Sequence, residues 1–369
     1  MEEEKKHQIA LTFLPHVGGS RAKVLIAYCG SAEAVFKEKK SNFIKIPGIG
    51  ELVVDSIFKK DSLKNSLVKA DKEIIFIEKN KITPISFLDD AFPKRLKHCQ
   101  DSPIMLYYKG IADLNTAKVL SIVGTRKATD YGKKICEEFV QELAAYNVLI
   151  VSGLAYGIDA YAHKAALANN LETVGVFAHG LDRIYPAIHK NIADKMILQG
   201  GLLTEFPSET IPNRENFPSR NRIVAGMADA VLVIESAKGG GSLITADLAT
   251  TYNRDVFAVP GRINDTFSEG CNFLIRNNKA ALAQSAKDIL YVMGWEEKLT
   301  KKNPKQAKLF AELSKEETML VNILKEKSLA IDDICFITQM TMSKTSALLL
   351  QLEFSGVIKS LPGKRYAMN

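Results

Sequence analysis

The stretch VLSIVGTR, residues 119–126, decides the fold class of this chain. Five apolar or small residues in a row are typical of a buried strand, and the glycine that follows them ends the run. Five similar runs come later, each separated from the next by a helical stretch. This alternation predicts an α/β domain in which a doubly wound, mostly parallel sheet is covered by helices on both faces. The expected strands cover residues 119–123, 148–151, 173–178, 202–205, 230–235 and 256–259.

Two segments beside this domain lack its pattern. Residues 71–117 contain Pro84, Pro93 and Pro103, so we expect an irregular lead-in with one or two edge strands. Residues 298–308 are rich in lysine and contain Pro304, which interrupts any periodicity. That composition is typical of a linker.

The C-terminal residues follow a third pattern. Ser314 and Glu317 have the spacing of a capping box, which predicts the start of a helix. The expected helices cover residues 319–327, 331–337 and 344–354. A Pro362-Gly363 turn then joins two expected strands, residues 357–361 and 364–368. Three helices followed by a hairpin predict a winged helix.

The N-terminal residues contain a repeat. The segments LPHVG, residues 14–18, and IPGIG, residues 46–50, share one pattern, and apolar residues follow each of them at helical spacing. Such pairs resemble helix-hairpin-helix motifs, in which a glycine turn exposes backbone N–H groups that can hold a phosphate. Paired hairpins serve equally well as packing or protein-contact modules, so both interpretations stay open.

Composition excludes several classes of protein. The 369 residues are 46% hydrophobic and 25% charged, and the mean hydropathy of −0.03 is typical of a globular chain rather than a disordered one. Neither a signal peptide nor a long apolar run is present, so we expect a cytoplasmic protein without a membrane partner. The five cysteines lie far apart and form no CxxC pair, so we expect neither disulfides nor a metal site. The net charge of +7 permits a polyanionic partner without requiring one.

The signature motifs of several enzyme classes are missing. The sequence has no GxxxxGK[ST], GxGxxG, HExxH or GxSxG. Asp159 and His163 form one suggestive acid and imidazole pair, and their i,i+4 spacing favours a helix-stabilising contact between them. We therefore expect no catalytic residues and no cofactor.

Three glycine-containing loops follow expected strands and cover residues 124–132, 152–157 and 236–242. Because the carboxyl ends of parallel strands share one edge of a sheet, these loops are expected to open into one crevice that binds anions. The glycines let a phosphate approach the backbone, and Ser242 is expected to cap its helix. The loops also carry the basic residues Arg126, Lys127 and Lys238.

A second basic group and a few aromatic residues suit the same kind of partner. Arg214, Arg220 and Arg222 precede the strand at residue 230, and in a helix we expect them at the opposite edge of the sheet. Salt bridges within the protein explain these arginines equally well. Rings for base stacking are available at Tyr131, Tyr156 and Phe217, of which Phe217 suits core packing better.

Four segments together resemble one protein family. They are IVGTR with Tyr131-Gly132, VSGLAYGID with His163, FPSRNRI and GSLITA, which begin at residues 122, 151, 217 and 241. In this order they resemble the DNA-processing protein family called DprA or Smf, over roughly residues 93–290. The resemblance implies a Rossmann-like core, an N-terminal SAM-like module that contains the helix-hairpin-helix pair, and a C-terminal winged helix. The implied division is 1–70, 71–297, the linker 298–308, and 309–369.

The resemblance also implies a function. The expected protein is bacterial, binds single-stranded DNA, protects incoming strands during natural transformation and loads the recombinase RecA, without covalent chemistry. It is expected to be a homodimer through its Rossmann-like domain. The glycine triplet 239–241 departs from the tighter turn expected of the family. The expected DNA-binding residues are Gly124, Thr125, Arg126, Lys127, Ser152, Gly153, Tyr156, Arg220, Asn221, Arg222, Lys238, Gly240, Gly241 and Ser242.

Two other functions compete with this one. A Rossmann-like nucleotide hydrolase or phosphoribohydrolase also uses glycine-rich loops, but its PGGxGT signature is missing and no carboxylate lies in residues 238–243. A transcriptional regulator would read duplex DNA with the winged helix. Between residues 343 and 356, however, only Lys344 is basic, which suits protein contact better than DNA readout.

Overall fold

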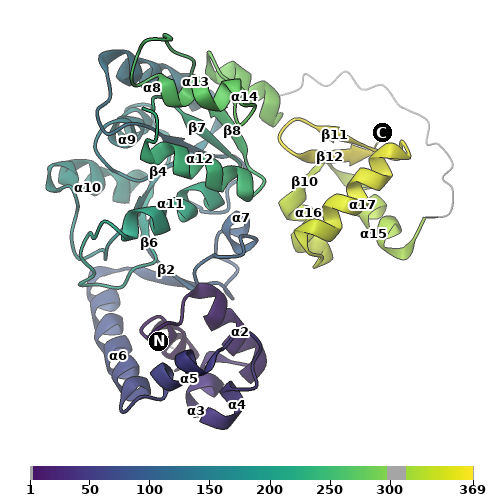
Figure 1. Ribbon diagram of the computed structural model, residues 1–369. Coiled ribbons are helices and arrows are strands. Elements are labelled where there is room, and N and C mark those ends of the chain that lie inside the picture. The colour runs from purple at the N-terminus through teal and green to yellow at the C-terminus, as the bar shows by residue number, and fades with distance from the viewer. Residues whose placement is uncertain (1–2, 297–312, 369) are drawn as a thin grey trace. The chain divides into compact units, whose positions relative to one another are not determined.

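The computed structural model describes residues 3–296 and 313–368, and the chain forms two compact units, residues 1–281 and 282–369 (Figure 1). The expected linker at residues 298–308 lies outside the described residues. In the described part of the chain, no helix is both long enough and apolar enough to cross a membrane.

Helices α1 to α6 pack around an apolar core in which Leu25, Phe43 and Ile57 are fully buried, and Met105 and Tyr107 from the later chain belong to the same core. Gly18 caps α2 and Gly50 caps α5 with almost the same extended backbone, φ −83° and −75°. The sequence repeat therefore has a structural counterpart. The helices are α1 (Glu3–Leu11), α2 (Gly19–Cys29), α3 (Ala32–Lys37), α4 (Lys40–Phe43), α5 (Glu51–Ile57) and α6 (Ser62–Asn80).

A nine-stranded sheet follows, in the order β1-β2-β6-β5-β4-β3-β7-β8-β9. The strands from β6 to β8 are parallel, whereas β2 pairs antiparallel with β6 and β1 antiparallel with β2. The predicted doubly wound, mostly parallel sheet is confirmed, with all six expected strands present. The strands are β1 (Thr83–Ser86), β2 (Met105–Gly110), β3 (Val119–Val123), β4 (Leu149–Ser152), β5 (Thr173–Phe177), β6 (Gly201–Thr204), β7 (Ala230–Val233), β8 (Asp255–Ala258) and β9 (Ala281–Leu282).

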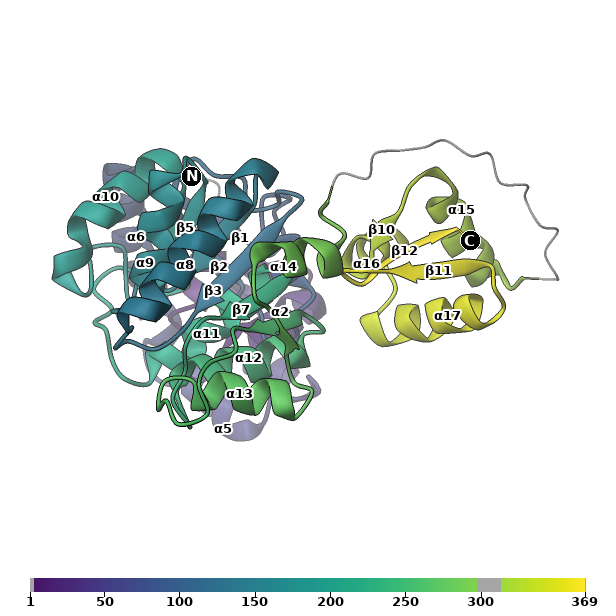
Figure 2. The ribbon, with the colours of Figure 1, turned by 90° about the horizontal axis from the view of Figure 1, so that it is seen from above.

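Helices cover both faces of this sheet. Figure 2 shows the strands between α8, α9 and α10 on one side and α11 and α12 on the other. The chain steps from β3 through β4 and β5 to β6, and α11 then returns it to β7 on the other side of β3. This reversal makes a topological switch point between β3 and β7, where α/β sheets commonly bind ligands. The helices are α7 (Lys94–Lys97), α8 (Asp130–Leu143), α9 (Ile158–Ala168), α10 (Lys190–Gln199), α11 (Asn216–Met227), α12 (Gly241–Thr251), α13 (Glu269–Arg276) and α14 (Ala286–Met293).

The burial pattern explains why these elements form. All five residues of β3 are buried, as expected of a central strand with helices on both faces. In α8 the apolar residues Cys136, Phe139, Val140 and Leu143 recur at helical spacing, and all four are buried. The strand and helix periods read from the sequence therefore match the faces that the fold buries.

The C-terminal residues form the predicted winged helix around Leu320, Ile334, Leu349 and Leu352. Its first helix begins before the expected residue 319, because Ser314 accepts from the Glu317 N–H while the Glu317 carboxylate accepts from the Ser314 N–H. The short strand β10 was not predicted. The elements are α15 (Lys315–Glu326), β10 (Leu329–Ala330), α16 (Ile331–Thr338), α17 (Met342–Phe354), β11 (Ile358–Leu361) and β12 (Arg365–Met368).

Candidate nucleic-acid interface

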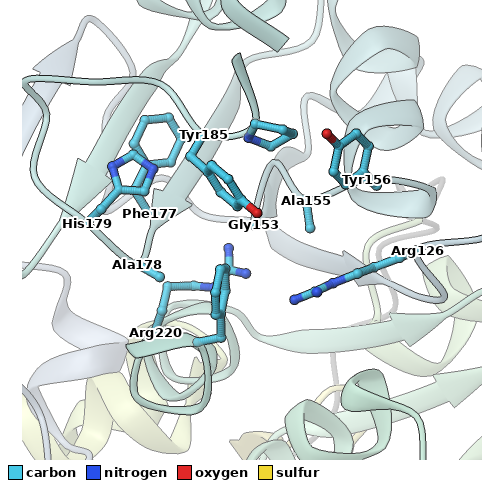
Figure 3. Close-up of a pocket in the computed structure, with 11 residues that line it drawn as sticks. Arg126, Gly153, Ala155, Tyr156, Phe177, Ala178, His179, Tyr185 and Arg220 are labelled. Carbon is cyan, nitrogen blue, oxygen red and sulfur yellow. The ribbon is translucent and has the colours of Figure 1, made fainter. Parts of the chain in front are cut away.

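A small pocket, partly open to solvent, lies at the carboxyl ends of β3, β4 and β5 (Figure 3). Its wall consists of the loops after these strands and the start of α11. The lining includes four residues expected from the sequence, Arg126, Gly153, Tyr156 and Arg220. It also includes His179, Tyr185 and Phe217.

The loop that carries Arg126 is tied across the switch point to Glu235, just beyond β7. The Thr125 N–H donates to the Glu235 carbonyl oxygen at 2.7 Å. The N–H and hydroxyl of Thr129 donate to the two oxygens of the Glu235 carboxylate, the former at 3.0 Å. Gly132 leaves room for this carboxylate, since a Cβ there would lie 2.1 Å from Oε2. These contacts with Glu235 fix the shape of the loop that carries Arg126, and no bound ligand is needed to hold it.

A second contact fixes the same loop from the side of α9. Gly157 has φ 77°, and a Cβ there would lie 2.1 Å from the Thr125 carbonyl oxygen. That oxygen accepts from the Ile158 N–H at 3.2 Å. Only glycine suits both this backbone conformation and this close approach. The first two glycine-containing loops are therefore locked together, as their convergence at one sheet edge predicted.

Arg126 points into the pocket from its rim (Figure 3). Its guanidinium carbon lies 5.1 Å from the centroid of the Phe217 ring, a cation–π distance. The sequence context of Phe217 favoured core packing, and this prediction is wrong. The Phe217 ring instead supports the Arg126 guanidinium at the pocket. The Arg126 side chain remains exposed to solvent.

Arg220 reaches the same pocket from α11, but it is only 4% exposed. Its Nη1 donates to the Val176 carbonyl oxygen at 2.6 Å, whereas its Nε is buried without a hydrogen-bond partner. Burial lowers the pKa of Arg220, and the nearby Asp159 carboxylate opposes that effect. Gly153 makes the position possible, since a Cβ there would lie 1.8 Å from Nη1. The prediction that the α11 arginines lie at the opposite edge of the sheet is wrong for Arg220.

Asp159 and His163 do not pair with each other, contrary to the sequence prediction. Asp159 accepts from the Ala155 N–H at 3.4 Å, and burial raises the pKa of its carboxyl despite the charge of Arg220. The Nδ1 of His163 lies 2.7 Å from the Thr173 hydroxyl. Burial lowers the pKa of His163 to about 3, so this imidazole is neutral at pH 7. The helical spacing was correct, but the two side chains find different buried partners.

Aromatic rings border the pocket. Tyr156 and Tyr185 are 49% and 47% exposed. The Tyr185 ring lies 6.4 Å from Phe217 and 6.5 Å from His179, while Tyr156 meets His189 edge-on at 5.4 Å. Two half-exposed rings beside two guanidinium groups make a site that can take both a phosphate and a base. Tyr185 was not among the residues expected to bind DNA. In the sequence, only its place in the loop after an expected strand pointed to the site.

Two family models match this chain. One, described as DNA recombination-mediator protein A, matches residues 83–294, and the DprA winged helix domain matches residues 304–364. The chain belongs to the DprA family. Protein Smf of Synechocystis is 31% identical to it over 98% of both chains.

Solved structures agree with this membership. The X-ray structure of DprA from Streptococcus pneumoniae has a TM-score of 0.67 and 33% identity, and the match covers 79% of this chain and 98% of that one. A structure of DprA from Helicobacter pylori, described with its single-stranded DNA binding mode, has a TM-score of 0.52 and 28% identity over 57% of this chain and 94% of that one. The Rossmann-like core and winged helix of this DprA-family chain are thus shared with known relatives.

The remaining expected residues of the DprA-family chain do not line the pocket. Gly124 and Thr125 belong to the anchored loop, and Lys127 beside them is exposed. Ser152 is fully buried and donates to the Ile122 carbonyl oxygen at 2.6 Å, so it holds β4 to β3. Asn221 is not part of the pocket lining.

Arg222 forms a salt bridge within the protein, one of the two interpretations that the sequence allowed. It is paired with Glu205 and also donates to the Asp101 carbonyl oxygen. Burial raises the pKa of the Glu205 carboxyl, and Arg222 opposes that shift. This arginine stabilises the contact between α11 and the lead-in segment and does not face the pocket.

The third glycine loop differs from its prediction. Gly240 is the N-cap of α12 and makes no side-chain bond, whereas Ser242 donates to the Ser236 hydroxyl at 2.8 Å. The expectation that Ser242 caps this helix is therefore wrong. Lys238 and Gly241 are exposed and lie outside the pocket lining. Among the described residues, no group of His, Cys, Asp and Glu side chains could hold a metal ion.

Proposed function

We propose that this DprA-family protein binds single-stranded DNA in the pocket between Arg126 and Arg220. The observation that carries the proposal is Arg220. A buried guanidinium with an unpartnered Nε, beside a pocket open to solvent, can bind an anion in addition to the nearby Asp159 carboxylate, which balances its charge only in part. The backbone phosphate of a strand is such an anion, and bidentate contact with phosphate is the usual role of arginine.

In this proposal the two arginines contact the strand in different ways. Arg220 offers a fixed, desolvated charge at the pocket floor, and Arg126 offers an exposed charge held by the Phe217 ring. Tyr156 and Tyr185 offer half-exposed faces on which bases can stack, whatever their sequence. Unstacked bases are available in a single strand and not in a duplex, so this site favours single-stranded DNA. The Helicobacter pylori relative, whose structure is described with a single-stranded DNA binding mode, supports this choice.

We propose binding without catalysis. No carboxylate is among the residues that line the described pocket, whereas the hydrolase alternative calls for one to act on a glycosidic bond. The one imidazole in the lining, His179, has its Nδ1 2.8 Å from the Gly180 carbonyl oxygen, and burial lowers its pKa. Such a group serves to pack against Phe177 rather than to transfer protons.

We extend the proposal to the cellular role that family membership supports. The protein would act in the cytoplasm, protect incoming strands during natural transformation and load RecA onto them. It would do so as a homodimer through its Rossmann-like domain. The proposed functional division stays 1–70, 71–297, 298–308 and 309–369, with the strand bound by the second part.

Two measurements on the purified protein distinguish DNA binding from the hydrolase hypothesis. Fluorescence anisotropy with a labelled single strand and the matching duplex measures affinity, and mass spectrometry of nucleoside monophosphates incubated with the protein measures turnover. The proposal predicts tighter binding of the single strand and no turnover. Equal affinity for both nucleic acids, or hydrolysis by the purified protein, would contradict it.

A further inference from the structure

Two lysines outside the pocket are held over one aromatic ring. The Lys164 Nζ lies 5.0 Å and the Lys133 Nζ 5.6 Å from the centroid of the Tyr161 ring. Both distances lie within the range of cation–π attraction, so a single ring fixes two long, flexible side chains. Lys133 comes from α8, and Tyr161 and Lys164 come from the neighbouring helix α9.

This lysine pair belongs to the two helices that follow the first two loops of the pocket. Lys133 follows, in the first turn of α8, the loop that carries Arg126. Tyr161 lies one turn into α9, which begins two residues after Tyr156. One helical turn rises only about 5 Å, so Lys133 lies within one turn and Lys164 within two turns of the start of its helix.

The charges around the pair leave it available to an anion. Lys133 forms a 2.8 Å ion pair with Asp130, whose side chain is 98% exposed. The Asp130 end of this pair is solvated, whereas the Lys133 side chain is 33% exposed. A surface ion pair contributes little, so a phosphate can compete with it. Lys164 is exposed. Holding the ammonium groups in advance also lowers the entropy that these side chains lose when they bind.

We propose that Lys133 and Lys164, positioned by Tyr161, form a second phosphate site that takes the backbone of the single strand where it leaves the pocket. The inference rests on the proposed function, since the pocket defines where the strand begins. The lysine pair adds affinity only for strands longer than the pocket holds. A strand that contacts both the pocket and the lysine pair would therefore run across α8 and α9.

The test compares the double variant K133Q/K164Q with wild type on two oligothymidylates, about four and about twenty nucleotides long. The variant should bind the long strand on the order of tenfold more weakly and the short one with unchanged affinity. The slope of log K against log salt for the long strand, which is negative, should become less steep by about 1.4, at about 0.7 per lost phosphate contact. The matched control is Lys134→Gln, which removes a neighbouring lysine of α8 that pairs with Glu138 and not with Tyr161.

Two further variants test the role of the ring. Tyr161→Phe keeps the ring but removes the hydroxyl that hydrogen-bonds Lys133, so it should lose less of the lysine contribution than Tyr161→Leu, which removes the ring as well. If K133Q/K164Q behaves like Lys134→Gln on the long strand, the second site is wrong. Failure of the pocket proposal gives a different result, because Arg126→Ala would then leave the short-strand affinity unchanged.

Discussion

Arg126 is exposed and held only by a ring and its anchored loop, so removing it should test binding without disturbing the fold. We expect Arg126→Ala to weaken single-strand binding by about 1 to 3 kcal/mol, the usual value of a charge-assisted contact to phosphate. Thermal melting should stay close to that of wild type. Lys134→Ala is the matched control, since Lys134 is exposed on α8 and lies outside the pocket lining. Unchanged affinity of Arg126→Ala at low salt would remove this arginine from the site.

Gly153 acts on binding through Arg220. The Cβ of Gly153→Ala would lie 1.8 Å from Nη1, so the guanidinium must leave its place beside Val176. We expect a loss of single-strand affinity of about 1 to 3 kcal/mol, as for removal of a charged contact, together with a lower melting temperature. Gly50→Ala controls for the change itself, because nothing lies within 4 Å of a Cβ at that position and Gly50 does not line the pocket. Equal binding by the two variants would show that Arg220 does not contact the strand.

His163 makes stability depend on pH. Burial lowers its pKa to about 3, whereas an unfolded histidine titrates near 6.5, so between these values the unfolded chain binds a proton that the native state does not. Its contribution is therefore fully present above pH 6.5 and is lost as the pH falls, by up to about 1.4 kcal/mol per pH unit. Urea unfolding of wild type and His163→Gln should give a difference that grows in favour of the variant as the medium becomes acidic. A constant difference from pH 7 to 4 would contradict this account.

The same substitution separates stability from function. His163 bonds Thr173 inside the domain and lies outside the pocket lining, so His163→Gln should cost some stability at pH 7. Single-strand affinity should stay within about threefold of wild type, or roughly 0.65 kcal/mol. If wild type hydrolyses nucleotides and His163→Gln does not, the result would support the nucleotide hydrolase hypothesis instead.

At the scale of elements, the loop between β3 and α8 owes its shape to Glu235 beyond β7. Glu235→Gln keeps the size of the side chain but replaces one carboxylate oxygen that accepts from Thr129 with an amide donor. We expect single-strand affinity to fall several-fold and stability by about 1 to 3 kcal/mol, because a buried donor loses its acceptor. Glu137→Gln, on the exposed face of α8, should change neither quantity. Normal binding by Glu235→Gln would mean that the loop does not need this anchor.

The elements were more predictable than the side chains at their ends. Each parallel strand shows as a short apolar run, because burial on both faces demands one, and the three glycine loops were found where those runs end. The sequence could not show which way α11 turns its arginines: Arg220 enters the pocket and Arg222 pairs with Glu205. Nor could it show that Phe217 faces Arg126, since a long-range ring contact leaves no local pattern. The apolar periodicity of the sequence identifies the buried faces of helices and strands, but the contact partners of individual side chains depend on tertiary packing.

At the scale of the molecule, we expect the winged helix to be dispensable for binding the single strand. The outer residues of α17 offer few charges, and Lys344 is paired with Glu316 at 2.5 Å. A chain cut within residues 298–308 should therefore keep its single-strand affinity within about threefold, or roughly 0.65 kcal/mol. Anisotropy with the truncated and full chains checks this. Loss of all binding would instead place the main DNA surface in the C-terminal unit.

The central claim is that the strand lies in the pocket between the two arginines, and photocrosslinking tests it most directly. An oligonucleotide that carries iodouracil is bound to the full chain and irradiated, and the attached peptides are identified by mass spectrometry. The account predicts crosslinks at Tyr156 and Tyr185, the half-exposed rings of the pocket, and their loss when an unlabelled single strand competes. Crosslinks confined to the winged helix or to residues 3–80, with both tyrosines unmodified, would contradict it.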